Sequence, residues 1–396
     1  MSKKRLIKIL IAGFHATFMV FFTLLLLYLD IPYDDRSLIV KISGITKKLI
    51  FSLDEKPDRK EFLFINTSYA NELIPRFDAA GFQIGDECIT NRAALAELFA
   101  RINKSPPNYK FILCDIFFKN RSPNDSLLRK EITGLYNIII PYHISKGNQV
   151  ERPVFEVLAG YADYPKLESD FMKFKLMLND TVKSIPLLLH EKINNLNTTK
   201  HFLVNHTGDG FSLNTVLIDF SIRNFDINNE LGNNSFPVIE INDLLEIEID
   251  SVFNEYLAGR YIVIGDFREK DFHSTPFGEM SGALILTNTF LTIKNGQDKL
   301  SFLFIVYLFI VFIILSLYVF SIRTRDKMKS KFTRIRRVNL PRKFLIYLAI
   351  FVTISIFSYS LFNIHLNIIV LSFYFNVIDI LVSARQKKKP NEEQSQ

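Results

Sequence analysis

The side chains of this chain that are best suited to chemistry gather in or just after two apolar runs, Phe111–Phe118 and Tyr261–Gly265. They are carboxylates with one imidazole and one hydroxyl. Carboxylate and imidazole groups bind metal ions of borderline hardness and also act as general acids and bases. The candidates are Asp115, Asp266, Asp271, His273 and Thr275.

Three interpretations of these candidates remain open. A structural turn is favoured by residue type, because Asp and Thr commonly cap loops and because Pro276 and Gly278 shape turns. A ligand site is favoured by position, because ligands of open α/β sheets bind at the carboxyl ends of the strands. A catalytic site has the least support, since the sequence contains no nucleophile elbow, no P-loop and no H-E-x-x-H or C-x-x-C motif. Whether a metal binds in this loop stays open.

Short apolar runs alternate with helical patterns between Asp30 and Lys299. This alternation predicts an α/β domain with one core, in which a mixed sheet is flanked by helices. The predicted strands are Glu61–Ile65, Lys110–Phe117, Asn137–Pro141, Asn214–Asp219 and Arg260–Ile264. The predicted helices are Asn91–Ile102, Asp125–Leu135, Asp180–Asn194, Asn242–Ile247 and Gly282–Ile293. Thr90 is the expected N-cap of the first helix, and residues 195–210 are expected to form a loop.

Four apolar runs are each long enough to cross roughly 30 Å of hydrocarbon as a helix. They are residues 9–29, 300–322, 344–362 and 366–384. The first run begins with basic residues, as a signal peptide does, but it is longer than a signal peptide's apolar region and has no small-residue cleavage site before Asp30. We therefore expect an uncleaved N-terminal anchor and three C-terminal transmembrane helices, with residues 30–299 forming one domain between them.

Basic residues flank the apolar runs on one side of the membrane only. Residues 1–8 carry four Lys or Arg, residues 323–343 carry ten, and the tail 385–396 carries four. The positive-inside rule places these segments in the cytoplasm and the domain outside, in what we expect to be a bacterial inner membrane. The same rule accounts for the net charge of +7, so no nucleic-acid partner is expected.

Two features of the membrane part are candidate partner contacts. The basic loop contains Arg334, Arg336 and Arg337, and attraction to anionic lipid explains them, with docking of a cytoplasmic protein as the alternative. Asp379 lies deep within the last predicted span, with Asn376 one turn before it on the same helical face. Helix packing or partner contact, solvation at the interface near Arg385, and ion translocation are its three interpretations. The last has the least support, because a transporter would show more polar groups or broken helices.

The two cysteines, Cys88 and Cys114, both fall in the domain expected outside the membrane, where a disulfide can persist. Cys114 lies in an apolar run that predicts a buried strand, whereas Cys88 is predicted to lie in a loop. Two unpaired cysteines are favoured over a disulfide.

The segment around the candidate residues resembles a known family. In order along the chain it contains Ile264-Gly265, Asp271, His273, Thr275-Pro276, Gly278 and Gly282. This order resembles the closing strand, loop and helix of the second CHASE family of extracellular sensory domains, which are associated with cyclases and histidine kinases. Two further segments resemble the family's Arg-containing helix start and its Phe-Asp-Ile-x-Phe strand end: Ile89–Ala94, with Arg92, and Cys114–Phe118.

The resemblance covers most of residues 30–299 and implies reception of a signal outside the membrane. It also implies the same layout, with one membrane span before the domain and three after it. Two departures are visible. The family's first strand usually ends in an Asp-rich triplet, where this chain has Ile65-Asn66-Thr67, and family members usually continue into an output domain, where this chain ends twelve residues after Ala384.

The leading hypothesis is a non-enzymatic sensor or binding subunit that uses no cofactor and signals to a separate, unidentified membrane, envelope or cytoplasmic protein. A scaffold subunit of an envelope complex is the first alternative, and a periplasmic metal-dependent hydrolase is the second. The sequence identifies neither the ligand nor the oligomeric state.

Overall fold

The computed structural model describes residues 3–29, 36–49, 52–53, 56–104, 108–145, 149–163, 170–208, 210–228, 235–268, 270–320 and 340–393. The chain divides into two compact units. The sheet unit consists of Asp54–Lys200 and Val216–Gln297. The helical unit consists of Met1–Leu53, His201–Thr215 and Asp298–Gln396.

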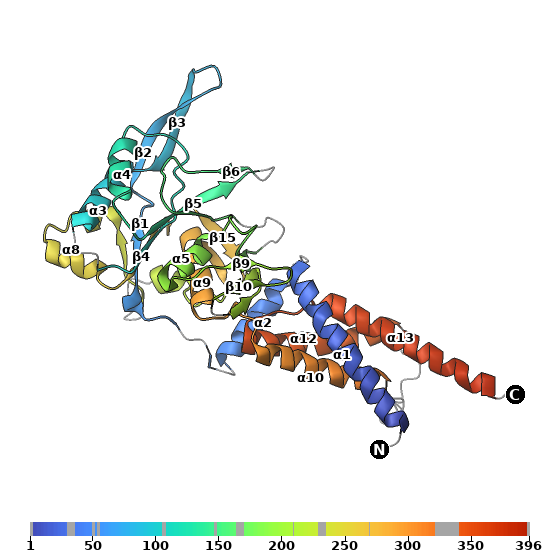
Figure 1. Cartoon of the computed structure of the whole chain (residues 1–396). Helices are drawn as coiled ribbons and strands as arrows, with labels where there is room; N and C mark the ends of the chain where they lie inside the picture. The colour runs from blue at the N-terminus through green and yellow to red at the C-terminus, as the bar shows by residue number, and fades with distance from the viewer. Residues whose placement is uncertain are drawn as a thin grey trace. The chain divides into compact units, whose positions relative to one another are not determined.

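A seven-stranded sheet forms the centre of the sheet unit (Figure 1). Its strand order is β13-β1-β14-β4-β5-β6, and β7 also pairs with β5. The bounds are β13 Val238–Glu240, β1 Phe62–Asn66, β14 Tyr261–Gly265, β4 Phe111–Cys114, β5 Ile138–Ile144, β6 Val150–Glu151 and β7 Ala159–Tyr161. All neighbours are parallel except β5 and β6, so β1, β14, β4 and β5 end at the same edge of the sheet.

Helices cover both faces of this sheet. Every residue of β1, β14 and β4 is buried, as expected for a parallel sheet covered on both sides. One apolar core joins the sheet to α5 (Ile185–Asn194), α6 (Asn224–Asn228) and α9 (Gly282–Lys294). The other core joins it to α3 (Arg92–Lys104), α4 (Asp125–Ile132), α7 (Ile241–Leu245) and α8 (Asp250–Leu257).

The described residues also form three two-stranded sheets. β2 (Asn71–Phe77) and β3 (Gln83–Thr90) form a long antiparallel hairpin that projects from the sheet unit in Figure 1. β15 (Phe272–Thr275) and β16 (Gly278–Ser281) form a short hairpin directly before α9. β8 (Lys173–Lys175) pairs with β12 (Thr215–Leu217).

Most predicted elements of the domain are present with shifted ends. The prediction that Arg260–Ile264 is a buried central strand is confirmed, because Val263 is 2% exposed in β14. The strand predicted to reach Phe117 ends at Cys114, and the helix predicted from Asp180 begins at Ile185. The second difference has a local cause: the Asn179 side chain accepts hydrogen bonds from the Thr181 and Val182 amides and so forms a turn there.

Three other details of the prediction are wrong. Asn91, and not Thr90, caps α3, because its side-chain oxygen accepts hydrogen bonds from the amides of Ala93 and Ala94. The segment predicted to be a loop at 195–210 contains the short strands β9 (Thr199–Lys200) and β10 (Asn205–Thr207) and the start of β11 (Gly210–Ser212). Cys88 lies in strand β3 and not in a loop.

The helical unit contains α1 (Lys3–Leu29), α2 (Arg36–Leu49), α10 (Phe302–Phe320), α12 (Leu340–Phe362) and α13 (Ile368–Glu393). Among the described residues, three segments are long and apolar enough to cross a membrane: Leu6–Leu29, Phe302–Phe320 and Lys343–Phe362. The apolar part of α13, Ile368–Ser383, is shorter than these. The predicted runs at 9–29, 300–322 and 344–362 therefore correspond to long apolar helices, and the fourth corresponds to a shorter one. The amphipathic helix α2 was not predicted.

Candidate functional site

The carboxyl edge of the central sheet is hollowed by a cavity of about 640 Å³. Cavities of this size hold small molecules in many proteins. Residues that follow β1, β4, β7 and β14, residues of the long hairpin, and the end of β5 all line it. The cavity therefore lies where the strand order brings the ends of five parallel strands together, which is where ligands of open α/β sheets bind.

Asp115 is placed in this cavity by the end of β4. Its amide donates a hydrogen bond of 2.8 Å to the carbonyl of Ile264 on β14, which continues the parallel ladder by one step. Its carboxylate is partly buried and lines the cavity. Within the described part of the chain, that carboxylate has neither a hydrogen bond nor an ion pair.

The β15–β16 hairpin brings Asp271 and His273 to the same cavity. His273 Nε2 lies 3.0 Å from Asp271 Oδ1. The Gly282 amide, at the start of α9, donates a 2.9 Å hydrogen bond to the Asp271 carbonyl. A Cβ atom at Gly282 would lie 2.1 Å from Asp271 Oδ2 and 3.1 Å from Asp115 Oδ2. Glycine at this position therefore lets two carboxylates approach the first turn of α9.

The surroundings of the Asp115 carboxyl group shift its pKa. The pKa of Asp115 is raised to about 7, mainly by burial and also by the charge of Asp271, while His143 and His273 oppose the rise. Asp115 therefore changes charge near neutral pH, unlike an ordinary aspartate.

A second histidine–aspartate pair faces the cavity from β5. His143 Nδ1 lies 2.8 Å from Asp163 Oδ1, and the Ile144 amide donates a hydrogen bond to the same carboxylate. The hydrogen bond to Asp163 raises the pKa of His143, and the hydrogen bond to Asp271 raises the pKa of His273 in the same way. Each histidine ring also meets an aromatic ring: His143 is 4.5 Å from Phe117 and His273 is 5.7 Å from Phe171, between ring centroids.

The side chains of Asp266 and Thr275, two further candidates, form hydrogen bonds with nearby backbone groups. Asp266 accepts hydrogen bonds from the Ser68 hydroxyl at 2.6 Å and from the Arg268 and Lys270 amides at 2.9 and 3.1 Å. Thr275 is buried, and its hydroxyl donates to the Gly278 carbonyl at 2.6 Å across the hairpin turn. Asp266 also lines the cavity, whereas Thr275 does not.

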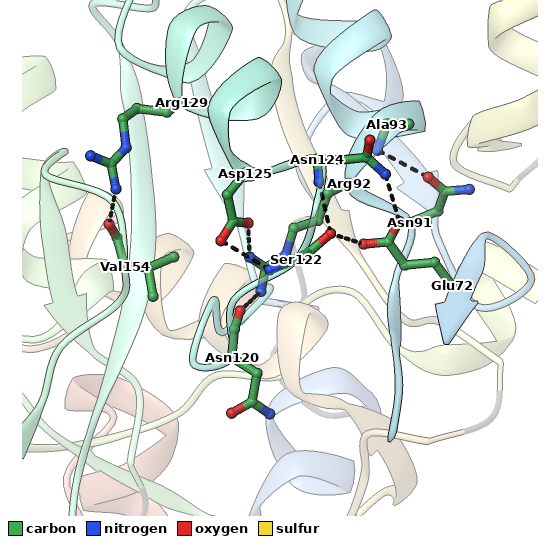
Figure 2. Close-up of polar contacts among 10 residues, drawn as sticks. All are labelled: Glu72, Asn91, Arg92, Ala93, Asn120, Ser122, Asn124, Asp125, Arg129 and Val154. Carbon is green, nitrogen blue, oxygen red and sulfur yellow. Dashed lines mark hydrogen bonds and ion pairs between the residues drawn. The ribbon is translucent and has the colours of Figure 1, made fainter. Parts of the chain in front are cut away.

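Arg92, the first residue of α3, fixes the loop that follows Asp115 (Figure 2). Its side chain is 2% exposed, pairs with Asp125 and donates a hydrogen bond to the Asn120 carbonyl. The guanidinium also lies 5.5 Å from the centroid of Phe118. In the same network, Glu72 of the long hairpin accepts hydrogen bonds from Ser122 and Asn124, so Arg92 and Glu72 hold this loop from two sides.

Two residues of the cavity were not among the candidates predicted from the sequence. His143 lies only two positions after the end of a predicted strand. Asp163 follows the three-residue strand β7 and has no pattern around it. Arg92 was singled out only through the family resemblance.

Neither a disulfide nor a metal-binding cluster is present among the described residues. Cys88 is exposed, Cys114 is buried, and both are free. The described residues contain no group of three His, Cys, Asp or Glu side chains placed to hold a metal ion.

The candidate residues of the membrane part lie elsewhere. Asp379 is 6% exposed and pairs with Lys343 across α12 and α13 at 3.0 Å, and Asn376, one turn before it, is also buried. The described contact of Asp379 is thus a pairing between helices. Arg334, Arg336 and Arg337 lie outside the described residues.

A further cluster of polar contacts in the membrane part was not predicted. His15 of α1 lies 2.7 Å from the Ser316 hydroxyl on α10 and 2.9 Å from the Tyr374 hydroxyl on α13. Polar side chains inside a bundle are rare and connect helices, so this cluster joins three helices at one level.

Comparison with known proteins gives one match. A family model described as the CHASE2 domain matches residues 77–320, which is more than half of the chain. The match contains Arg92, Asp115, Asp271 and His273 and ends at the last residue of α10. No curated protein and no solved structure matches the chain.

Proposed function

Because the chain belongs to the CHASE2 domain family, a family of sensory domains, we propose that it is a membrane-anchored sensor subunit. In this proposal the sheet unit binds a ligand outside the membrane, and the membrane helices carry the signal to a separate protein. The observation that supports it most directly is the cavity of about 640 Å³, whose wall includes the first residue of α9.

The chain itself supplies a route from this cavity to the membrane. Asp271 and His273 lie on the hairpin that leads into α9, and α9 ends at Lys294, only a few residues before α10 begins at Phe302. Within the helical unit, α10 contacts His15 of α1 through Ser316. A ligand that moves the first turn of α9 would therefore act on α10 through the covalent chain, and on α1 through this hydrogen bond.

The proposed topology has residues 30–299 outside the membrane and both chain ends in the cytoplasm of a bacterial cell. It is supported by the basic residues at 1–8, 323–343 and 385–396. It has four crossings, with the last made by α13. The pair Lys343–Asp379 supports this, because a carboxylate buried among membrane helices is stable when a cation neutralises it.

We further propose that the chain does not catalyse a reaction and that its output is a protein contact. The partner is an unidentified membrane, envelope or cytoplasmic protein, and the basic loop around Arg336 contacts anionic lipid. The hydrolase alternative would need a metal, and the described carboxylates and imidazoles of the cavity are already engaged in pairs or backbone contacts, apart from Asp115.

One observation favours the scaffold alternative. The β2–β3 hairpin exposes large apolar side chains, with Leu73, Phe77, Phe82 and Ile84 each more than half exposed. Exposed apolar side chains clustered on a projecting element are typical of protein-binding surfaces.

Copurification of the full chain from native membranes in mild detergent tests the sensor proposal against the scaffold. A sensor should retain a partner whose enzymatic output differs between wild type and Asp115→Asn, while Glu279→Gln, on the same hairpin as His273 but outside the cavity, leaves that output unchanged. If Phe82→Ser releases the partner while both charge variants leave its output unaltered, the scaffold function is correct instead.

A further inference from the structure

We infer that the cavity binds a small organic cation with a primary ammonium group, held between Asp115 and Asp271. This inference rests on the proposed function, because it names the ligand class of the same cavity. The family match assigns no ligand.

The formal charges of the cavity wall favour a cation. The carboxylates are Glu87, Asp115, Asp163, Asp266 and Asp271, and the permanent cations are Arg92 and Lys270. Arg92 is neutralised by Asp125. The excess of negative charge concentrates cations in the cavity and repels anions.

All but one of these carboxylates already have partners. Asp163 pairs with His143, Asp271 pairs with His273, Asp266 accepts backbone and hydroxyl hydrogen bonds, and Glu87 accepts a 2.8 Å hydrogen bond from the Asn120 amide group. Asp115 alone has no such partner among the described residues. A carboxylate withdrawn from water without a partner is unfavourable, so a cation that binds there gains a strong contact.

The remaining walls suit an organic cation better than a bare metal ion. Phe117 and Phe171 both line the cavity, and aromatic rings attract ammonium groups within about 6 Å of the ring centroid. The volume of about 640 Å³ is far larger than one ion requires. The described residues also lack a set of three metal-binding side chains.

Protons compete with such a ligand. Asp115 has a pKa of about 7, raised by burial and by Asp271 and opposed by His143 and His273, while Lys270, Arg92, Asp163 and Asp266 line the same cavity. Below that pH the carboxyl group is neutral and no longer attracts a cation. Binding should therefore weaken by up to about tenfold for each unit of pH below 7.

Calorimetric titration of the full chain in lipid nanodiscs tests the inference. The probe is 1,4-diaminobutane, and the matched controls are 1,4-butanediol, which is neutral, and succinate, which is anionic. We expect the diamine alone to bind, more tightly at pH 8 than at pH 6. Asp115→Asn should weaken binding by at least about tenfold and remove its pH dependence, whereas Glu279→Gln should bind as wild type does.

Three results would contradict the inference that the cavity binds an ammonium group. Binding of succinate or butanediol in place of the diamine, no binding of the diamine at pH 8, or equal binding by Asp115→Asn would overturn the inference. A thermal melt of each variant shows that the protein is folded when it is titrated. The proposed function can fail separately from this inference. If the diamine binds the cavity but neither the diamine nor Asp115→Asn changes the partner's output, the sensor proposal is refuted and the cation site remains.

Discussion

At the scale of single residues, Asp115 links folding to pH. Its pKa of about 7 lies above that of an unfolded aspartate, about 4, so the folded chain retains a proton that the unfolded chain releases in this range. The stability that this proton contributes is complete below about pH 4 and is lost as the pH rises through 7.

Replacing Asp115 by Asn should therefore stabilise the protein at high pH. We expect the variant to exceed wild type by about 1–3 kcal/mol at pH 8 and by less at pH 5, because one unit of pKa corresponds to about 1.4 kcal/mol and the cavity is open to water. Melting curves of both proteins at the two pH values measure this. A difference that does not vary with pH would show that the Asp115 carboxyl is not responsible.

Arg92 provides a second prediction at this scale. Arg92→Lys keeps the charge but loses the planar group that reaches both Asp125 and the Asn120 carbonyl. We expect a loss of about 1.5–3 kcal/mol in the free energy of unfolding, since a lysine cannot make the hydrogen bonds to the partly buried Asp125 carboxylate and to the Asn120 carbonyl at the same time. Arg129→Lys is the matched control, because Arg129 is exposed and its side chain donates a hydrogen bond to the Val154 carbonyl in the same region (Figure 2). Equal effects of the two substitutions on urea unfolding would contradict the structural role of Arg92.

At the scale of elements, the packing of β7 against α5 depends on Gly160. A Cβ atom there would lie 2.7 Å from the backbone nitrogen of Ile185, at the start of α5. Backbone cannot move aside as a side-chain end can, so Gly160→Ala should destabilise the protein by about 1–3 kcal/mol. Gly13→Ala, in α1, has no heavy atom within 4 Å of the added carbon and serves as the control in the same thermal melt. If Gly160→Ala melted as wild type, the described contact would be incorrect.

The elements that could be predicted from the sequence are those whose pattern reflects burial. β14 is a continuous apolar run that ends in glycine and α9 is a largely apolar helix that begins with glycine, and both have their predicted positions to within one residue. The β2–β3 hairpin could not be predicted, because nearly all of its side chains are exposed and its strands carry no alternation. The helix α2 was not predicted for a different reason. Its residues follow the first membrane helix in the sequence and were assigned to the domain as a whole.

The sequence predicts the cavity residues that follow recognisable strands, but not the residues that tertiary contacts bring to them. Asp115, Asp266, Asp271 and His273 follow strands that are recognisable, and the structure places all four around one cavity. Other residues of the cavity come from elements with weak signals. Asp163 follows a three-residue strand, and Lys270 Nζ lies 3.5 Å from the sulfur of Cys88 on the long hairpin. Tertiary contacts of this kind leave no local pattern.

At the scale of the whole molecule, the exposed thiol of Cys88 allows a direct test of orientation. A membrane-impermeant maleimide added to intact cells should modify wild-type protein at Cys88, since Cys114 is buried. In a Cys88→Ser background, Arg336→Cys should stay unmodified until the cells are opened. The reverse pattern would place the sheet unit in the cytoplasm and remove the basis of the sensor proposal.

The burial of α9 bears on how any signal leaves the cavity. All residues from Ala283 to Ile293 are buried, so this helix is enclosed by protein on every side. A close-packed interior does not deform gradually, and it changes by exchanging one set of contacts for another. A thirteen-residue helix is also a stiff rod of about 20 Å. If the sensor proposal holds, motion at the first turn of α9 should therefore reach its last turn as a discrete step, and each molecule should switch between two states instead of passing through intermediate ones.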